Sequence, residues 1–283
     1  MSFLSEPFGV LLNFIYNHLA FCSYGLTIIV FTLFVKILLF PLNLKQQKST
    51  AKMQALQPEL DALKETCGSD NELLMQEQNK LYAKYNVNPM SGCLPTLIQL
   101  PILLVVYNII ISPLTYIAGI STESVTKLAE IAGITTTNKS QLLVNAFFLK
   151  DASAITEEVS SIMGGESFVN MTFLKIFNLG TAPTEFFSSW DWSIAPLLLI
   201  PVLCLASQYF LQWMSTGGKK KNKKQEDPSA RSMNMMLKLM PLMTFFIALT
   251  TPAGLGFYWT VSNLFTILQT YITNKFFLDK KEG

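Results

Sequence analysis

The stretch "YGLTIIVFTLFVKILLFPL" (24–42) is apolar along nearly its whole length, yet it carries one ammonium group, that of Lys36. A helix needs about 20 predominantly apolar residues to cross the hydrocarbon core of a bilayer, so this stretch predicts a transmembrane helix. A lysine at the centre of such a helix costs roughly 2.5–3.5 kcal/mol on insertion scales. Lys36 therefore either extends its side chain to water at the membrane surface or lies in a hollow that water enters.

The composition of the whole chain also indicates a membrane protein. Half of its 283 residues are hydrophobic and only 14% are charged, and the mean hydropathy is +0.36. These values are too apolar for an ordinary soluble domain of this length. Five stretches approach the length of a span, namely 24–42, 93–113, 194–214, 235–251 and 255–276. The predicted fold is an all-α polytopic membrane protein with five transmembrane helices.

The distribution of lysine predicts how these spans are oriented, because short loops rich in lysine and arginine stay in the cytoplasm. The segment 43–92 and the loop 215–234, which contains "KKKNKK" (219–224), both carry many lysines. The turn "TPAG" (251–254) carries none. We therefore predict a multi-pass protein of the cell membrane with its N-terminus outside and its short tail, 277–283, in the cytoplasm.

Three segments outside the predicted spans also have patterns of their own. Residues 1–23 have apolar residues at helical spacing and predict an amphipathic helix at the outer membrane surface. In 43–92 the helical pattern stops at "CGSD" (67–70) and then resumes, which predicts a helical hairpin in the cytoplasm. Residues 114–193 contain apolar pieces too short to span, and we expect an extracytoplasmic loop or cap there.

The chain contains no pattern typical of a catalytic or metal site. There is no nucleotide-binding loop, serine hydrolase elbow or zinc protease motif. The four cysteines show no CxxC spacing, and His18 is the single histidine. The predicted spans also lack the buried carboxylates that serve as relays in proton-coupled carriers. We therefore expect no catalytic residue, no cofactor and no metal, and a protein that is not an enzyme.

Three long strings occur in order along the chain: "FVKILLFPLNLKQQKSTAKMQALQPEL" (34–60), "NPMSGCLPTLIQLPILLVVYNII" (88–110) and "PAGLGFYWTVSNLFTILQTYI" (252–272). They resemble the YidC-type membrane protein insertase family, in its five-span, Gram-positive-like form without the large periplasmic domain. The resemblance implies five helices around a hydrophilic groove in the inner half of the membrane. That groove is open to the cytoplasm and to lipid, and closed to the outside.

The resemblance also assigns residues to this groove. Members of the family have a single basic residue of the first span there, usually arginine, and Lys36 occupies that position. Thr32 matches a groove position on the same helix face, and Tyr258 with Trp259 matches an aromatic pair that contacts the substrate. Gln99 and Gln208 are assigned only because they are polar residues within spans. Lysine in place of arginine keeps the charge but loses the bidentate fork.

The function implied by the resemblance is that of a membrane protein insertase and chaperone. It would move hydrophobic segments of nascent proteins from the cytoplasm into the bilayer, alone or with the Sec translocon. The implied partners are nascent membrane proteins, the Sec translocon, membrane lipids and the ribosome, the last through the hairpin and 219–224, with the protein acting as a monomer. The lysines of 219–224 suit ribosomal RNA phosphates and anionic lipid equally well, and the alternative is that they only set the topology.

Two alternatives come from other classes of protein. A membrane-bound enzyme acting on lipid would need a nucleophile with a base, and the predicted spans lack one. A small-solute transporter or channel could use Lys36 as an anion site. A pore needs polar residues in the outer half of the membrane too, and residues 27–31, "TIIVF", offer almost none. The external segment 114–193 is longer than the resemblance implies, and its role is not indicated by the sequence.

Overall fold

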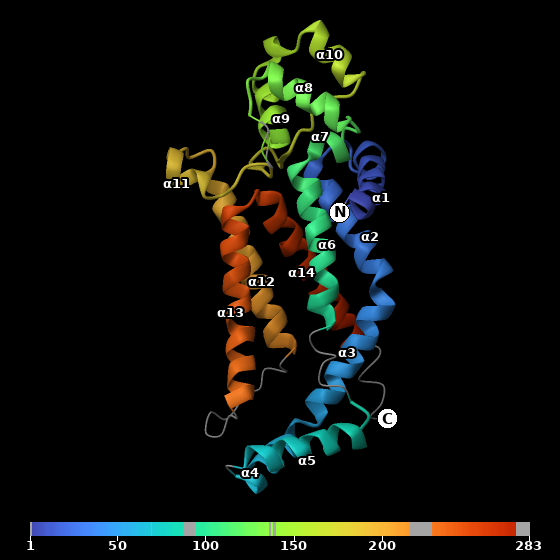
Figure 1. Ribbon diagram of the computed structural model, residues 1–283, viewed down its shortest axis with the longest axis vertical. Coiled ribbons are helices and arrows are strands. Elements are labelled where there is room, and N and C mark those ends of the chain that lie inside the picture. The colour runs from blue at the N-terminus through green and yellow to red at the C-terminus, as the bar shows by residue number, and fades with distance from the viewer. Residues whose placement is uncertain are drawn as a thin grey trace. The chain divides into compact units, whose positions relative to one another are not determined.

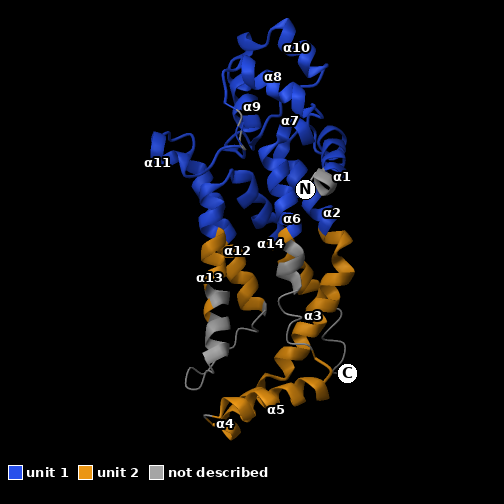
Figure 2. Ribbon diagram, in the orientation of Figure 1, with its two compact units in different colours: residues 1–35, 101–204, 245–262 blue, residues 36–100, 205–244, 263–283 orange. Residues whose placement is uncertain are grey.

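The computed structural model describes residues 2–68, 70–87, 94–135, 137, 140–215 and 228–275, and it divides into two compact units. The first unit comprises Met1–Val35, Pro101–Cys204 and Phe245–Ser262. The second unit comprises Lys36–Leu100, Leu205–Thr244 and Asn263–Gly283. Figure 2 shows the two units in different colours.

Helices make up most of the described chain, in agreement with the predicted all-α fold class (Figure 1). Their bounds are α1 Ser2–Phe14, α2 Tyr24–Leu38, α3 Phe40–Ala55, α4 Gln57–Cys67, α5 Asn71–Lys84, α6 Leu94–Ile111, α7 Pro113–Tyr116, α8 Thr122–Ile131, α9 Ser140–Lys150, α10 Glu157–Met163, α11 Glu185–Ser189, α12 Leu199–Ser215, α13 Pro228–Thr250 and α14 Ala253–Thr273. A π-helical turn, Ile15–Leu19, follows α1, and 3-10 turns cover Ala152–Ala154 and Ala195–Leu198. Strands β1 Thr172–Phe173 and β2 Phe177–Asn178 pair antiparallel.

Each of the five apolar stretches contains a helix, but their lengths differ. Among the described residues, Ala195–Met214 is the one helix long and apolar enough to cross a membrane by itself, with 20 residues and a mean hydropathy of 1.6. Helices α2 and α3 pass the same criterion as a pair, bent by 64° at their break. Leu100–Ile111 and Leu239–Thr250 are apolar but shorter. The count of five spans therefore stays a prediction.

The break between α2 and α3 lies inside the first predicted span, which was expected to run without interruption from 24 to 42. Pro41 explains the break, because its ring has no N–H to donate to the carbonyl of Ile37 and clashes with that carbonyl. The helical path does not end at residue 42 but resumes at Phe40 and continues to Ala55.

In the first unit, the N-terminal helix packs against other helices of the protein. The ring of Phe8 meets the ring of Phe31 edge-on at 5.7 Å between centroids. The side chain of Asn13 donates to the carbonyl oxygen of Ile117 at 2.6 Å, and Leu12 is buried. The amphipathic pattern of 1–23 therefore forms a helix whose apolar side is covered in part by protein.

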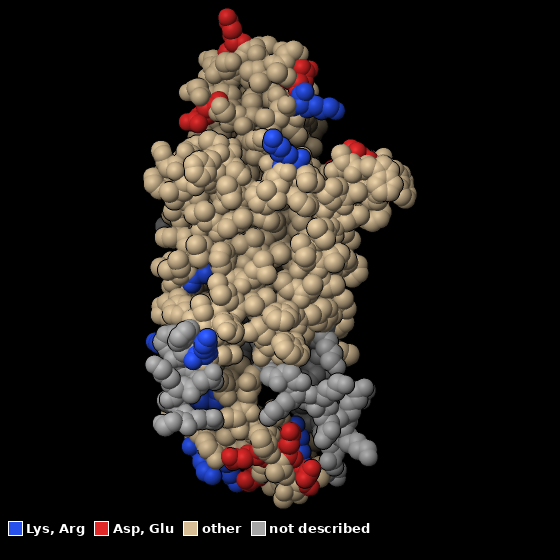
Figure 3. All heavy atoms as spheres, turned by 180° about the vertical axis from the view of Figure 1, so that it is seen from behind, with Lys and Arg blue, Asp and Glu red and all other residues tan. Residues whose placement is uncertain are grey.

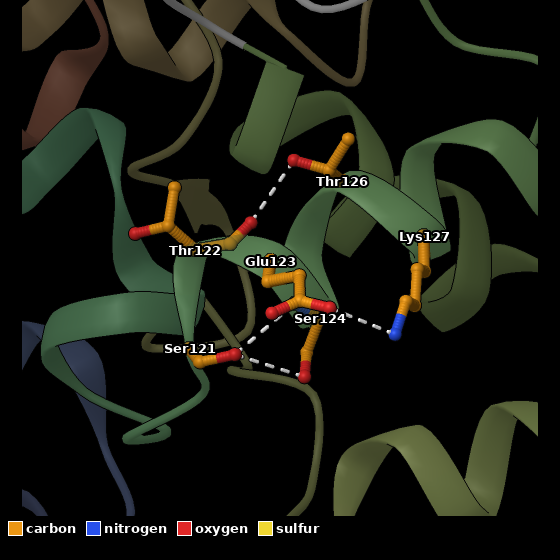
Figure 4. A network of polar contacts seen from close by, with 6 residues as sticks. All are labelled: Ser121, Thr122, Glu123, Ser124, Thr126 and Lys127. Carbon is orange, nitrogen blue, oxygen red and sulfur yellow. Dashed lines mark hydrogen bonds and ion pairs between the residues drawn. The ribbon is translucent and has the colours of Figure 1, made fainter.

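The segment 114–193, called the cap below, is a folded part of the first unit. The side-chain amide of Asn145 donates to the carbonyl oxygen of Val169 and accepts from its N–H, both at 2.8 Å. Ser121 caps α8 by accepting from the N–H of Ser124 at 3.1 Å, as Figure 4 shows together with neighbouring polar contacts of this helix. On the face seen in Figure 3, the charged side chains of the first unit gather on the cap.

The end of the cap is tied to the turn between α13 and α14. Backbone N–H groups of Ala253 and Gly254 donate to the carbonyl oxygens of Thr181 and Leu179 at 2.9 and 2.8 Å. A Cβ on Gly254 would lie 3.2 Å from the oxygen of Leu179, which is tighter than an ordinary van der Waals contact, so the close approach favours glycine. The "TPAG" turn is therefore hydrogen-bonded to the backbone of the cap.

In the second unit, α4 and α5 form a helical hairpin whose reversal falls at the "CGSD" stretch. Asp70 caps α5 by accepting from the N–H groups of Glu72 and Leu73. The hydroxyl of Tyr85 donates to the carboxylate of Glu59 at 2.7 Å. A small apolar core closes the hairpin, made of Leu56, Leu60, Val87, Met53, Leu81 and Tyr82. Its location in the cytoplasm stays a prediction.

Candidate functional site

A line of hydrogen bonds joins α14 to α2 and α3 within the second unit. Three side chains of α2 and α3 each donate to one side chain of α14. The pairs are Lys36 Nζ to Thr266 Oγ1 at 2.9 Å, Asn43 Nδ2 to Gln269 Oε1 at 3.3 Å, and Gln47 Nε2 to Thr270 Oγ1 at 3.2 Å. We call these six residues the polar seam.

Sequence spacing places the members of the polar seam on one side of each helix. Asn43 and Gln47 are four residues apart on α3 and therefore lie on one face of it, whereas Lys36 belongs to α2, before the bend of 64°. Thr266 and Thr270 are four residues apart and therefore also lie on one face. Polar groups that would each be costly in an apolar helix can thus bond to one another across the pair.

Several buried polar atoms of the second unit, one of them in the polar seam, have no hydrogen-bond partner within the described part of the chain. They are Nε2 of Gln46, Oε1 of Gln47, Oε1 of Gln208 and Oγ1 of Thr273. Ser207, next to Gln208, accepts from the side-chain amide of Asn263 at 2.9 Å. Because buried polar groups are nearly always hydrogen-bonded to protein or water, these atoms are positioned to bind water or a polar group of a ligand.

Lys36 holds the one cationic group of the polar seam. Its side chain is partly exposed, and its ammonium reaches the hydroxyl of Thr266 on α14. No carboxylate of the described residues forms an ion pair with it. A neutral hydroxyl does not compensate a positive charge in an apolar surrounding, so the ammonium needs water or an incoming anion.

The other residues assigned to the groove are divided between the two units. Gln208 lies with Lys36 in the second unit, whereas Thr32, Tyr258 and Trp259 lie in the first unit. Gln99 belongs to α6, but its side chain lies outside the described part. The hydroxyl of Thr32 donates to the carbonyl oxygen of residue 28 on its own helix at 2.6 Å. It is 1% exposed.

Tyr258 and Trp259 are both buried in the first unit. Tyr258 borders a cavity of about 10 Å³, lined otherwise by Tyr24 and apolar side chains such as Ile28 and Val106. A cavity of this size holds about one water at most. The hydroxyl of Tyr24 has no partner among the described residues. The cavity beside Tyr258 is thus small and mostly apolar, in contrast to the polar seam.

Sequence reasoning missed part of this site. It assigned Asn43, Gln46 and Gln47 to the cytoplasmic hairpin, and it did not single out Thr266 and Thr270. The four-residue spacing of Asn43 and Gln47, and the repeat of polar residues at three and four residues along 263–273, are the signals that could have found them. The loop 219–224 and the tail 277–283 lie outside the described residues.

Comparison with known proteins gives a consistent picture. Residues 14–281 match the family described as 60Kd inner membrane protein. The chain is 32% identical, over 87% of its length, to the inner membrane ALBINO3-like protein 2, chloroplastic, of Chlamydomonas reinhardtii. It is 32% identical, over 88% of its length, to membrane protein insertase YidC 2 of Bacillus anthracis. It is 30% identical, over 92% of its length, to membrane protein insertase YidC of Amoebophilus asiaticus.

These relatives differ in how much of them the chain covers. The matched region spans 49% of the Chlamydomonas protein and 34% of the Amoebophilus protein. It spans 71% of the Bacillus protein. The likeness to a Bacillus relative is consistent with the Gram-positive-like form expected from the three strings.

Proposed function

The chain belongs to the 60Kd inner membrane protein family, and we propose that it is a membrane protein insertase and chaperone. It moves hydrophobic segments of nascent proteins from the cytoplasm into the bilayer. The names of the two bacterial relatives support this activity. The observation that carries the proposal is the ammonium of Lys36, held at a polar seam with no carboxylate partner among the described residues.

The mechanism follows from the chemistry of the polar seam. Water that enters the seam solvates Lys36 and the buried amide groups, which removes most of the cost of a charge within the membrane. A short acidic or polar tail of a substrate binds there, next to the ammonium. Its apolar segment then moves into lipid, driven by roughly 25 cal/mol per Å² of apolar surface removed from water. The proposed function needs no nucleotide.

The arrangement in the membrane is part of the same proposal. Five spans, at 24–42, 93–113, 194–214, 235–251 and 255–276, surround the groove, with the N-terminus outside. Thr32, Gln99, Gln208, Tyr258 and Trp259 contribute to substrate binding with Lys36. The partners are nascent membrane proteins, the ribosome at the hairpin and at 219–224, and the Sec translocon, and the protein acts as a monomer.

Reconstitution in liposomes tests this function. The substrate is a single-span protein with an acidic N-terminal tail, and protease protection of that tail measures insertion. We expect insertion with wild type and with Lys36→Arg, and a strong loss with Lys36→Ala. Wild-type liposomes that insert no more substrate than empty liposomes would contradict the proposal.

The alternative of a small-solute transporter or channel has no support from the relatives' names. The cavity beside Tyr258 has a volume of about 10 Å³ and a mostly apolar lining, which does not suit a polar solute. Flux of small anions through the same liposomes, lost in Lys36→Ala while protein insertion is absent, would favour that alternative.

A further inference from the structure

Two tryptophans of the cap are exposed to an unusual degree. The segment "EFFSSWDW" (185–192) forms α11 and the turn after it. Its Phe187, Trp190 and Trp192 are 55%, 67% and 77% exposed, whereas Phe186 is 7% exposed. The ring of Phe186 contacts the rings of the other three at 5.5 to 5.7 Å between centroids. We call these four residues the aromatic foot.

The aromatic foot is held in a defined conformation by its own backbone. Trp190 adopts a left-handed φ of 52°, and its N–H donates to the carbonyl oxygen of Phe186 at 2.8 Å. A non-glycine residue in this region costs roughly 1–2 kcal/mol. Asp191 accepts from the N–H of Ser193 at 2.9 Å, which ties its carboxylate to the turn. The two indoles are therefore presented outward by a built turn.

The position of the aromatic foot along the chain places it at one end of a span. Trp192 lies three residues before Ala195–Met214, the one described helix that is both long enough and apolar enough to cross a membrane by itself. Twenty residues of helix are about 30 Å long, which matches the hydrocarbon thickness. Trp213, at the opposite end of this helix, is 58% exposed. Tryptophans flanking a span at both ends are typical of the aromatic belts at the two membrane surfaces.

The first turns of α12, which follow the aromatic foot in the chain, also carry exposed apolar side chains. Leu199, Val202 and Leu203 of α12 are each about half exposed, as expected of side chains in contact with lipid. Figure 1 shows α11 standing out to one side at the beginning of α12, apart from α8 and α10.

We propose that the aromatic foot inserts into the lipid headgroup region at the membrane surface where α12 begins, and anchors the cap to the bilayer. An indole suits this layer because its ring is apolar while its N–H bonds to water or headgroup oxygens. Exposure of this much aromatic surface to water would be unfavourable, and lipid covers it without a protein partner. The proposal requires that α12 spans the membrane and is independent of the insertase activity.

Tryptophan fluorescence in liposomes tests the anchor, because the chain has four tryptophans. Four variants each keep one of Trp190, Trp192, Trp213 and Trp259 and carry phenylalanine at the other three positions. Each is reconstituted with lipids brominated near the headgroup or deep in the acyl chain. Aqueous acrylamide serves as the opposite quencher. Trp259 is the buried control, and Trp213 is the control at the far end of α12.

We expect the emission of Trp190 and Trp192 to lie at shorter wavelength in liposomes than in denaturant without detergent. We also expect the lipid that is brominated near the headgroup to quench most of this emission. Trp259 should lose little with either lipid. Strong quenching of Trp190 and Trp192 by acrylamide, with none by brominated lipid, would overturn the proposal. Protection from both quenchers would also overturn it, because a second protein copy would then cover the foot.

A measurement on the unaltered chain guards against variants that fail to fold. A lipid with a photoactivatable group near its headgroup is added to wild-type liposomes, and mass spectrometry locates the labelled peptides. Label on 185–192 supports the anchor. Label on α12 without any on 185–192 contradicts it.

Discussion

The charge of Lys36 should set which substrate tails the protein accepts. The perturbation pairs two variants, Lys36→Met and Lys36→Glu, with three substrates that share one apolar segment. Their N-terminal tails are acidic, neutral or basic. Methionine keeps the unbranched apolar stem and removes the charge, and Lys36→Arg serves as the control that keeps the charge.

The expected size of the effect depends on how much water surrounds the ammonium. Two opposite charges 4 Å apart attract by about 4 kcal/mol at an effective dielectric constant of 20, and by about 1 kcal/mol in bulk water. About 1.4 kcal/mol is a factor of ten in an equilibrium constant. Removal of the charge should therefore weaken binding of the acidic tail roughly a thousandfold at a dielectric constant of 20, and about fivefold in bulk water. Partial exposure of Lys36 places it between these limits.

The assay measures initial rates of tail protection in proteoliposomes at low ionic strength, at matched protein content. We expect Lys36→Met to lower the insertion rate of the substrate with the acidic tail and to leave the rate of the neutral substrate close to that of wild type. Lys36→Glu should insert the substrate with the basic tail fastest. Lys36→Arg should follow wild type. The reasoning is refuted if all four proteins rank the three tails alike, because the ammonium would then not contact the substrate. A loss equal for all tails would instead indicate a structural role in holding α14.

Three further predictions concern the rest of the molecule. Gly254→Ala places a methyl group 3.2 Å from a backbone oxygen, so thermal unfolding in detergent should begin at lower temperature than in wild type. Asn145→Ala leaves two buried backbone groups of Val169 without partners; a cost of about 2–6 kcal/mol follows, which limited proteolysis of the cap should detect as faster cleavage. The hydrogen bond to Glu59 raises the pKa of Tyr85, so this contact stabilises the hairpin below the ordinary tyrosine pKa of about 10 and is lost above the raised value. The tyrosinate absorbance is measured against pH for wild type and for Tyr85→Phe, and the difference reports the ionisation of Tyr85. Its midpoint should lie above pH 10, and a midpoint at or below pH 10 would contradict the hydrogen bond.

Long apolar runs and their breaks were readable from the chain alone. The five apolar stretches each contain a helix because burial in lipid or protein requires every backbone group to bond within its own segment. The reversal at 67–70 was also readable, because Gly68 ends one helix with a φ of 58° and Asp70 caps the next. The division of the first stretch was missed, although Pro41 carried the information.

The polar seam required coordinates. A glutamine within an apolar helix looks the same in sequence whether it bonds a neighbouring helix, binds water or only ends a span, because periodicity gives a face but not a partner. Gln47 and Thr270 are separated by 223 residues, and their bond at 3.2 Å depends on which helices pack together. The sequence therefore determined the helices, the family and the position of one lysine within an apolar stretch. The fold decided what surrounds that charge, since contacts distant along the chain arise from packing alone.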